Sequence, residues 1–212
     1  MSIKHHLQEE TLLAYAAGNL PEAFNLIVAA HVSLCDDCRA VVESYNSVGG
    51  AVLETAEASA MAADSLTQTL ARLDREAVEE RTTPAKGALP QPVQSYLGGD
   101  LDAVRWRPVG MGVKQAILPT SSSATARLLM IPAGTAIPDH SHEGMEMTLV
   151  LQGAFMDEDD RFARGDIEVA DGSVSHTPVA DIGEDCICLA VTDAPLKFKS
   201  FLPKIAQKFA RL

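Results

Sequence analysis

The chain has 212 residues, an apolar fraction of 47% and a formal net charge of −12. The acidic charge disfavours direct binding to nucleic acid phosphates, but it suits a basic protein partner. Four cysteines at uneven spacings fit a reducing compartment better than a disulfide framework. The sequence starts without a basic segment leading into an apolar one and holds no apolar run of membrane-spanning length, so we expect a cytoplasmic protein that does not contact a membrane.

Apolar residues in the first part of the chain recur at helical spacing. A short helix is expected over residues 9–17, where Gly18 would end it. Pro21 would open a second helix that runs to about Val32, and a third would begin near Asp36. This half therefore predicts a small helical bundle.

The segment around the second helix carries a metal-binding pattern. His31, Cys35 and Cys38 lie one helical turn apart, so their side chains point the same way. Zinc takes four such nitrogen and sulfur ligands in a tetrahedron, and we expect His6 as the fourth, with His5 as the second candidate. The alternatives are a redox pair or two small buried cysteines. A redox pair is expected beside a strand-helix-strand unit, which the helical periodicity disfavours.

A further helix is expected over residues 64–80, beyond a glycine pair and an alanine-rich stretch. Leu66, Leu70 and Leu73 fall on one of its sides, and the other sides are strongly polar. Two interpretations are open: the leucines complete a four-helix core, or they stay partly free for a partner. Both could hold in different states of the protein.

The composition of the chain changes after the predicted helices. Prolines and glycines over residues 82–95 predict a linker between a helical domain at 1–81 and a second domain at 96–195. In the second domain, short segments rich in strand formers, such as 103–109, 124–131 and 186–191, alternate with turns. This pattern predicts a β-sandwich or barrel. Residues 196–212 are basic and are expected to form a closing helix against the acidic barrel.

The second domain contains another group of metal-ligating residue types. His140 and His142 share one face of a strand, Glu146 follows a turn, and His176 comes from a later strand. Such side chains are costly inside a barrel unless a cation unites them. We therefore expect a divalent metal there, with zinc first and iron, manganese or nickel as alternatives.

These residues resemble a known family. A complete first motif of the cupins, small jelly-roll barrels, is formed by Gly134, His140, His142, Glu146 and Gly153. The second cupin motif matches loosely: Gly165 and His176 fit, whereas Asp171-Gly172 replaces the usual proline and offset glycine, and the usual closing asparagine is missing. The resemblance implies a jelly-roll barrel in which His140, His142, Glu146 and His176 bind the metal.

The first half resembles the zinc-binding anti-sigma domains of bacteria, whose signature is a histidine followed by His-x3-Cys-x2-Cys. His6, His31, Cys35 and Cys38 carry that signature. Together the two resemblances imply a cytoplasmic anti-sigma factor that binds one extracytoplasmic-function sigma factor in a 1:1 complex. It would repress a stress response, such as that to singlet oxygen, and the cupin would tune release. We expect Leu66, Leu70 and Leu73 to contact the partner.

Two other functions are considered. Metal cupins include dioxygenases and isomerases, so the barrel site could be catalytic, but the attached helical zinc module disfavours an enzyme. A thiol switch could operate at Cys35 and Cys38 or at Cys186 and Cys188. For the second pair, two buried small residues are the expected interpretation.

Overall fold

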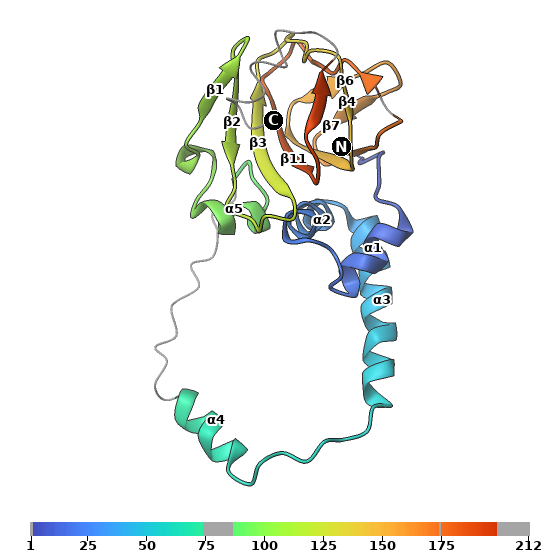
Figure 1. Ribbon diagram of the computed structural model, residues 1–212, viewed down its shortest axis with the longest axis vertical. Coiled ribbons are helices and arrows are strands. Elements are labelled where there is room, and N and C mark those ends of the chain that lie inside the picture. Colours follow the sequence, from blue (N-terminus) through green and yellow to red (C-terminus); the bar gives the residue numbers. More distant parts are fainter. Residues whose placement is uncertain (1, 74–86, 174, 199–212) are drawn as a thin grey trace.

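The computed structural model describes residues 2–73, 87–173 and 175–198. Helices come first along the chain and a β-barrel follows (Figure 1). The helices are α1 (Glu9–Ala16), α2 (Glu22–Leu34), α3 (Asp36–Glu54), α4 (Ser65–Leu73) and α5 (Gln91–Leu97), with a short 3₁₀ helix, η1 (Leu101–Ala103), before the first strand. The expected fold class, a helical module followed by a cupin-like barrel, is confirmed.

The first helices begin and end where the sequence signals predict. Gly18 adopts a φ of +70° just after α1, a conformation that costs glycine little. Pro21 is the N-cap of α2, and Cys35 is the N-cap of α3, where its sulfur accepts a hydrogen bond from the Cys38 amide. The α3 helix is longer than its sequence suggests, because it continues through Gly49-Gly50 to Glu54.

The leucine-bearing helix, α4, stands apart from the other helices (Figure 1). None of its residues is buried, and Leu66, Leu70 and Leu73 are 71%, 52% and 68% exposed. The interpretation that this stripe completes a four-helix core is therefore wrong, because no other described element covers it. The remainder of the helix expected over residues 64–80 lies outside the described residues.

The strands form three antiparallel sheets. A six-stranded sheet has the order β1-β2-β3-β11-β5-β8, and two three-stranded sheets have the orders β10-β6-β7 and β12-β4-β9. The strands are β1 (Arg107–Gly110), β2 (Val113–Ile117), β3 (Thr125–Ile131), β4 (His140–His142), β5 (Glu146–Gln152), β6 (Ala154–Met156), β7 (Arg161–Ala163), β8 (Ile167–Ala170), β9 (Ser175–His176), β10 (Val179–Ala180), β11 (Cys186–Thr192) and β12 (Leu196–Phe198).

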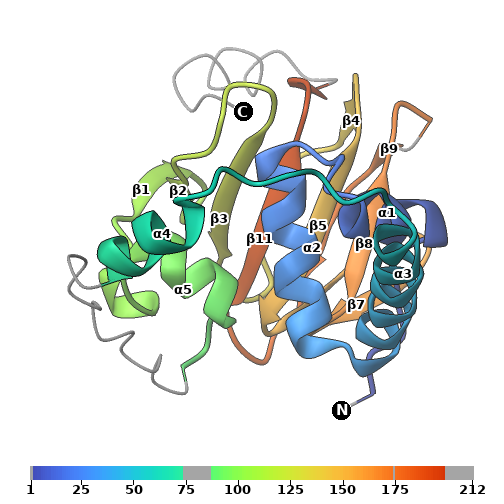
Figure 2. The same cartoon turned by 90° about the horizontal axis from the view of Figure 1, so that it is seen from below.

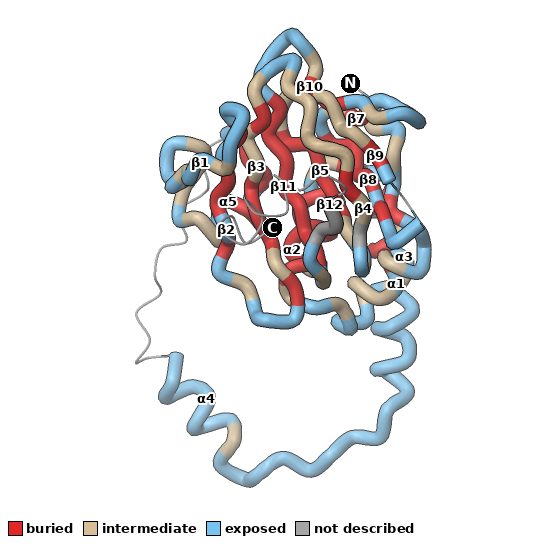
Figure 3. Tube along the Cα trace, turned by 45° about the horizontal axis from the view of Figure 1, so that its top comes forward, coloured by how far each residue is buried: buried red, intermediate tan, exposed pale blue. Residues whose placement is uncertain are grey.

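The large sheet is buried on both faces. Helix α2 lies across its outer face over β3, β11 and β5 (Figure 2). Side chains alternate along each strand, so in β11 Leu189 and Val191 pack against the helix, whereas Cys188 and Ala190 face the barrel interior. Burial is concentrated in this sandwich, while α4 and the end of α3 are exposed (Figure 3). One apolar core thus joins α2 to the barrel.

Polar contacts fasten the same helix to the barrel side of the chain. The Glu22 carboxylate, at the start of α2, accepts hydrogen bonds from the Tyr96 hydroxyl at 2.8 Å and the Ser121 amide at 2.7 Å. The Arg164 guanidinium donates to the carbonyl of Ala88, just before α5, at 2.8 Å. The first two contacts tie the start of α2 to α5 and to the barrel, and the third ties the segment before α5 to the turn between β7 and β8.

Of three expectations about the second half, two are partly wrong and the third stays a prediction. The strand expected over 103–109 is wrong in its first half, because residues 101–103 form η1 and β1 starts at Arg107. The closing helix expected over 196–212 is wrong at its start, since Leu196–Phe198 pairs with β4, and the rest lies outside the described residues. The domain boundaries stay a prediction, although α5 occupies residues 91–97. No helix in the described part of the chain could cross a membrane.

Candidate functional sites

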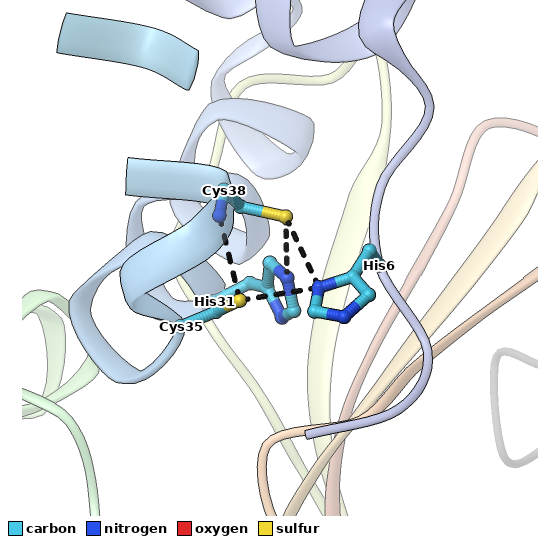
Figure 4. Close-up of side chains that lie close together, drawn as sticks. All are labelled: His6, His31, Cys35 and Cys38. Atoms are coloured by element: carbon cyan, nitrogen blue, oxygen red, sulfur yellow. Dashed lines mark hydrogen bonds between the residues drawn. The ribbon is translucent and has the colours of Figure 1, made fainter. Parts of the chain in front are cut away.

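The four expected ligands of the helical module lie together (Figure 4). His31 comes from the last turns of α2, Cys35 from the α2–α3 junction and Cys38 from the first turn of α3. His6 reaches them from the extended segment before α1. Three of the four side chains are buried, and His6 is exposed.

The distances between the ligand atoms suit a tetrahedral metal ion. His31 Nε2 lies 3.3 Å from Cys38 Sγ, and His6 Nδ1 lies 3.3 Å from Cys35 Sγ and 3.6 Å from Cys38 Sγ. Zinc bonds of about 2.0–2.3 Å place tetrahedral ligands about 3.3–3.8 Å apart. All four ligand atoms lie within 4.8 Å of one another, so the cluster can hold a metal ion.

The protonation of the cluster is set by burial. Burial lowers the pKa of His31 to about 4 against the opposing hydrogen bond to Gly165, so its imidazole is neutral at pH 7. Its Nδ1–H donates to the Gly165 carbonyl at 3.0 Å, which leaves the Nε2 lone pair directed at the cluster. Burial also raises the pKa of Cys38 to about 11, so without a metal this thiol keeps its proton.

A turn of the barrel helps to build this cluster. The turn consists of Ala163 to Asp166, between β7 and β8. Its Gly165 carbonyl orients His31, and the buried Asp166 carboxylate accepts hydrogen bonds from the amides of Lys4 at 2.6 Å and His5 at 3.0 Å. These amides immediately precede His6. The turn therefore holds two of the four ligands from outside the helical module.

Asp166 stays ionised in this position. Burial alone would raise its pKa, but hydrogen bonds from the amides of Ala163, Lys4 and His5 outweigh burial and leave the pKa below its ordinary value. A depressed carboxyl pKa stabilises the fold above the pKa of the unfolded chain and loses that contribution only as pH falls through the folded value. The contact is thus fully formed at neutral pH.

His5, the second candidate for the fourth ligand, is used elsewhere. Its Nε2 lies 2.9 Å from the Asp160 carboxylate, and its ring packs against Phe162 with centroids 4.3 Å apart. His5 therefore anchors the N-terminal segment on the barrel, and it leaves His6 as the residue that completes the cluster.

The second candidate site lies inside the barrel. His140 and His176 face each other across β4 and β9, with their Nε2 atoms 3.3 Å apart. The Nδ1–H of His140 donates to the Pro138 carbonyl at 2.9 Å, and Nδ1 of His176 lies 2.9 Å from the Glu168 carboxylate. With Nδ1 of His140 bonded to Pro138 and Nδ1 of His176 beside Glu168, the two Nε2 atoms turn toward each other, as metal ligands do.

The other two expected barrel ligands are placed less completely. Glu146 lines the same cavity as the two histidines, at the start of β5. The side chain of His142 lies outside the described set, although its backbone is in β4 beside His140. The structure thus brings together His140 and His176 and places Glu146 near them.

Sequence analysis missed two acidic residues at this site. Glu168, on β8, and Asp157 lie beside His176, and these three form a group with ligand atoms within 4.8 Å of one another. Burial raises the pKa of Glu168. Burial alone would lower the pKa of His176, but the hydrogen bond to Glu168 and the charge of that carboxylate outweigh burial, so the pKa of His176 is raised. The sequence signal for Glu168 is its position as a glutamate inside the otherwise apolar strand 167–170.

The second cysteine pair is part of the barrel wall. Cys186 and Cys188 are fully buried on β11, and their sulfurs lie 3.5 Å apart. The hydrogen bond with Cys186 and burial raise the pKa of Cys188 well above its ordinary value. A protonated, buried thiol is a poor nucleophile, which suits a packing role.

Comparison with known proteins agrees with both halves of this architecture. Residues 95–195 match the family described as the ChrR Cupin-like domain. The crystal structure of Rhodobacter sphaeroides SigE in complex with the anti-sigma ChrR matches with a TM-score of 0.81 and 52% identity, covering 91% of this chain and 100% of that chain. A helical His/Cys module joined to a cupin-like barrel thus defines a regulatory protein of the anti-sigma class.

The full-length sequence comparison gives the family. The chain is 55% identical over 215 residues to the anti-sigma-E factor ChrR of Cereibacter sphaeroides, and the match covers 100% of each chain. The chain belongs to the ChrR family of anti-sigma factors.

The contact between Asp166 and the N-terminal segment generates a first prediction. Asp166→Asn removes acceptor capacity for the amides before His6, so transfer of zinc to a chelator should become about 10- to 100-fold faster. The matched control is Asp160→Asn, which removes an exposed contact to the His5 side chain and should change the rate little. Equal rates for wild type and Asp166→Asn would contradict this role for the turn.

The protonated Cys38 thiol generates a second prediction. At about pH 8, Zn²⁺ added to the metal-free protein should release at least about one proton per ion, because binding requires the thiolate. A pH-indicator dye in weak buffer measures the release, and zinc affinity should rise with pH. Cys38→Ser supplies the control, with less proton release. Stoichiometric zinc uptake without proton release would show that Cys38 is already ionised.

Proposed function

We propose that the protein is an anti-sigma factor that binds an extracytoplasmic-function sigma factor in a 1:1 complex and keeps it from core RNA polymerase. The observation that carries the proposal is the uncovered apolar face of α4. The relatives support it, since one is called an anti-sigma-E factor and another was solved in complex with SigE. An acidic chain in the cytoplasm suits a partner with basic surfaces.

The partner surface proposed here is the apolar face of α4 and the end of α3. On α4 it comprises Leu66, Leu70 and Leu73, as expected from the sequence. Val52 and Leu53 at the end of α3 are 65% and 74% exposed. Large apolar side chains spaced along a helix are typical anchors for a hydrophobic groove, and a helix that packs on no other described element gains stability from such docking.

Zinc bound by His6, His31, Cys35 and Cys38 would fix the start of α3, and the other end of that helix belongs to the proposed partner surface. It would join the N-terminal segment, α2 and the first turn of α3, and so set the direction of α3. A structural zinc ion contributes roughly 10 kcal/mol or more to folding of the element that it joins. Loss of the ion would release His6 and the start of α3 together, which couples metal content to sigma binding.

The barrel is proposed to bind a divalent metal through His140, His142, Glu146 and His176. The paired Nε2 atoms of His140 and His176 support this, and Glu168 would orient His176 from behind. Zinc is the first candidate, with iron, manganese or nickel as alternatives. When bound, the metal supplies a Lewis-acidic position at the polar end of the cavity. We propose a sensing role for this site, in a response such as that to singlet oxygen, and no catalytic one.

The exposed leucines generate the test of the main proposal. Leu70→Asp places a charge in the apolar interface, so the Kd for Rhodobacter sphaeroides SigE should rise at least about tenfold while zinc content stays normal. The control is Ile182→Asp, at a barrel residue that is 91% exposed and distant from α4 in the fold. Calorimetric titration measures the Kd, and unchanged affinity of a zinc-replete Leu70→Asp protein would refute the proposed surface.

The barrel site has its own test. His176→Ala should lower the metal content measured by mass spectrometry from about two ions per chain to about one, because the remaining ligands bind weakly. Binding to SigE should persist, since the helical cluster keeps its four ligands. Control protein Ser175→Ala, changed at the exposed neighbour on β9, should keep both ions. Full metal content in His176→Ala would exclude the proposed ligand set.

A further inference from the structure

The barrel encloses a cavity of which the proposed metal ligands line only a part. Its volume is about 330 Å³, at the lower end of the range of ligand pockets. The walls are mostly apolar and come from the inner faces of both layers of the barrel. They include Val113, Leu129, Ile131, Ile137, Phe155 and Ala190. A cavity of this size lined by apolar side chains suits the body of a small organic molecule.

Charged groups collect on one part of the cavity wall. Arg127, Glu146, Glu168, His140 and His176 all line it. The imidazoles and Glu146 belong to the proposed metal site, and Glu168 is held by His176. Arg127 cannot be one of the metal ligands, because a positively charged guanidinium does not bind a cation.

Arg127 is buried without a full set of partners. It lies on β3 and is only 5% exposed, and its side chain points to the inner face with Leu129 and Ile131. One of its terminal nitrogens donates a long hydrogen bond of 3.5 Å to the Gln115 side chain. Its Nε is buried and has no hydrogen-bond acceptor among the described residues. A buried donor left without an acceptor destabilises the fold, and more so when the group is charged.

We infer that this cavity binds a small apolar monocarboxylate, whose carboxylate pairs with Arg127 and whose hydrocarbon body fills the apolar part of the barrel. The planar guanidinium matches a carboxylate in two parallel hydrogen bonds. Such a ligand would satisfy Nε and also remove apolar wall surface from water. An alcohol or amine of the same length would cover the same apolar wall surface but could not form the two parallel hydrogen bonds to Arg127.

The charges around Arg127 also favour an anion. Burial lowers the pKa of Arg127, and the negative charge of Glu146 opposes this by stabilising the charged guanidinium. Once Glu146 binds the proposed metal, its charge is shared with a dication, and the guanidinium gains room for a second negative group. The carboxylate would then lie between Arg127 and the metal position at the polar end of the cavity. This inference adds a ligand to the barrel and does not depend on the sigma partner.

Octanoate, octanol and octylamine are suitable probes, titrated by calorimetry into full-length protein of measured metal content. Octanoate should bind at least about tenfold more tightly than either neutral or cationic analogue, since a charge-assisted hydrogen bond to a buried group is worth that much. Arg127→Met keeps an unbranched apolar stem, removes the guanidinium and should abolish the preference. Arg105→Met, at an exposed arginine, should retain it.

Two results would overturn the inference: equal affinity of wild-type protein for the three probes, or no binding of octanoate. Persistence of the octanoate preference in a folded Arg127→Met protein would assign the carboxylate to the metal and equally exclude Arg127. If Arg127→Met does not fold by circular dichroism, Leu129→Trp fills the apolar part instead. That variant should lose octanoate binding, and unchanged binding there would place octanoate outside the cavity.

Discussion

The hydrogen bond from His31 to the Gly165 carbonyl is the contact on which the arrangement of the two halves depends. It fixes the imidazole tautomer that a metal requires, and its acceptor belongs to the barrel. Asp166, next along the chain, holds the segment that carries His6. A cluster whose four ligands all come from the first 38 residues is therefore positioned by a turn about 130 residues later in the sequence. The helical module and the barrel form one working unit at this point.

The inner and outer faces of the large sheet have different roles. The outer face packs against α2, which ends in the helical cluster, whereas the inner face carries Glu146, Glu168 and Arg127 and faces His140 and His176 on the sheet β12-β4-β9. Strands β5 and β11 contribute to both faces. The same two strands therefore join the cavity wall directly to the helix that ends at the cluster.

Sequence reasoning succeeded where the information is local. The spacing of His31, Cys35 and Cys38, the end of α1 at Gly18 and the start of α3 at Asp36 all depend on neighbours within a few residues. It failed where a distant segment decides the outcome. An amphipathic pattern over α4 cannot tell whether another element covers its leucines. Likewise, Glu168 and Arg127 acquire their roles only because strand pairing brings β8 and β3 to the same interior as His176.

The position of α2 also determines how the molecule loses its structure. Ala23, Ile27, Val28 and Ala30 are completely buried between the sheet and the other helices. Separation of the helical half from the barrel would expose this helix and the outer face of the sheet to water together, with a large apolar heat-capacity increment. We therefore expect the barrel and α2 to unfold in a single cooperative transition, because neither can keep its apolar face buried without the other.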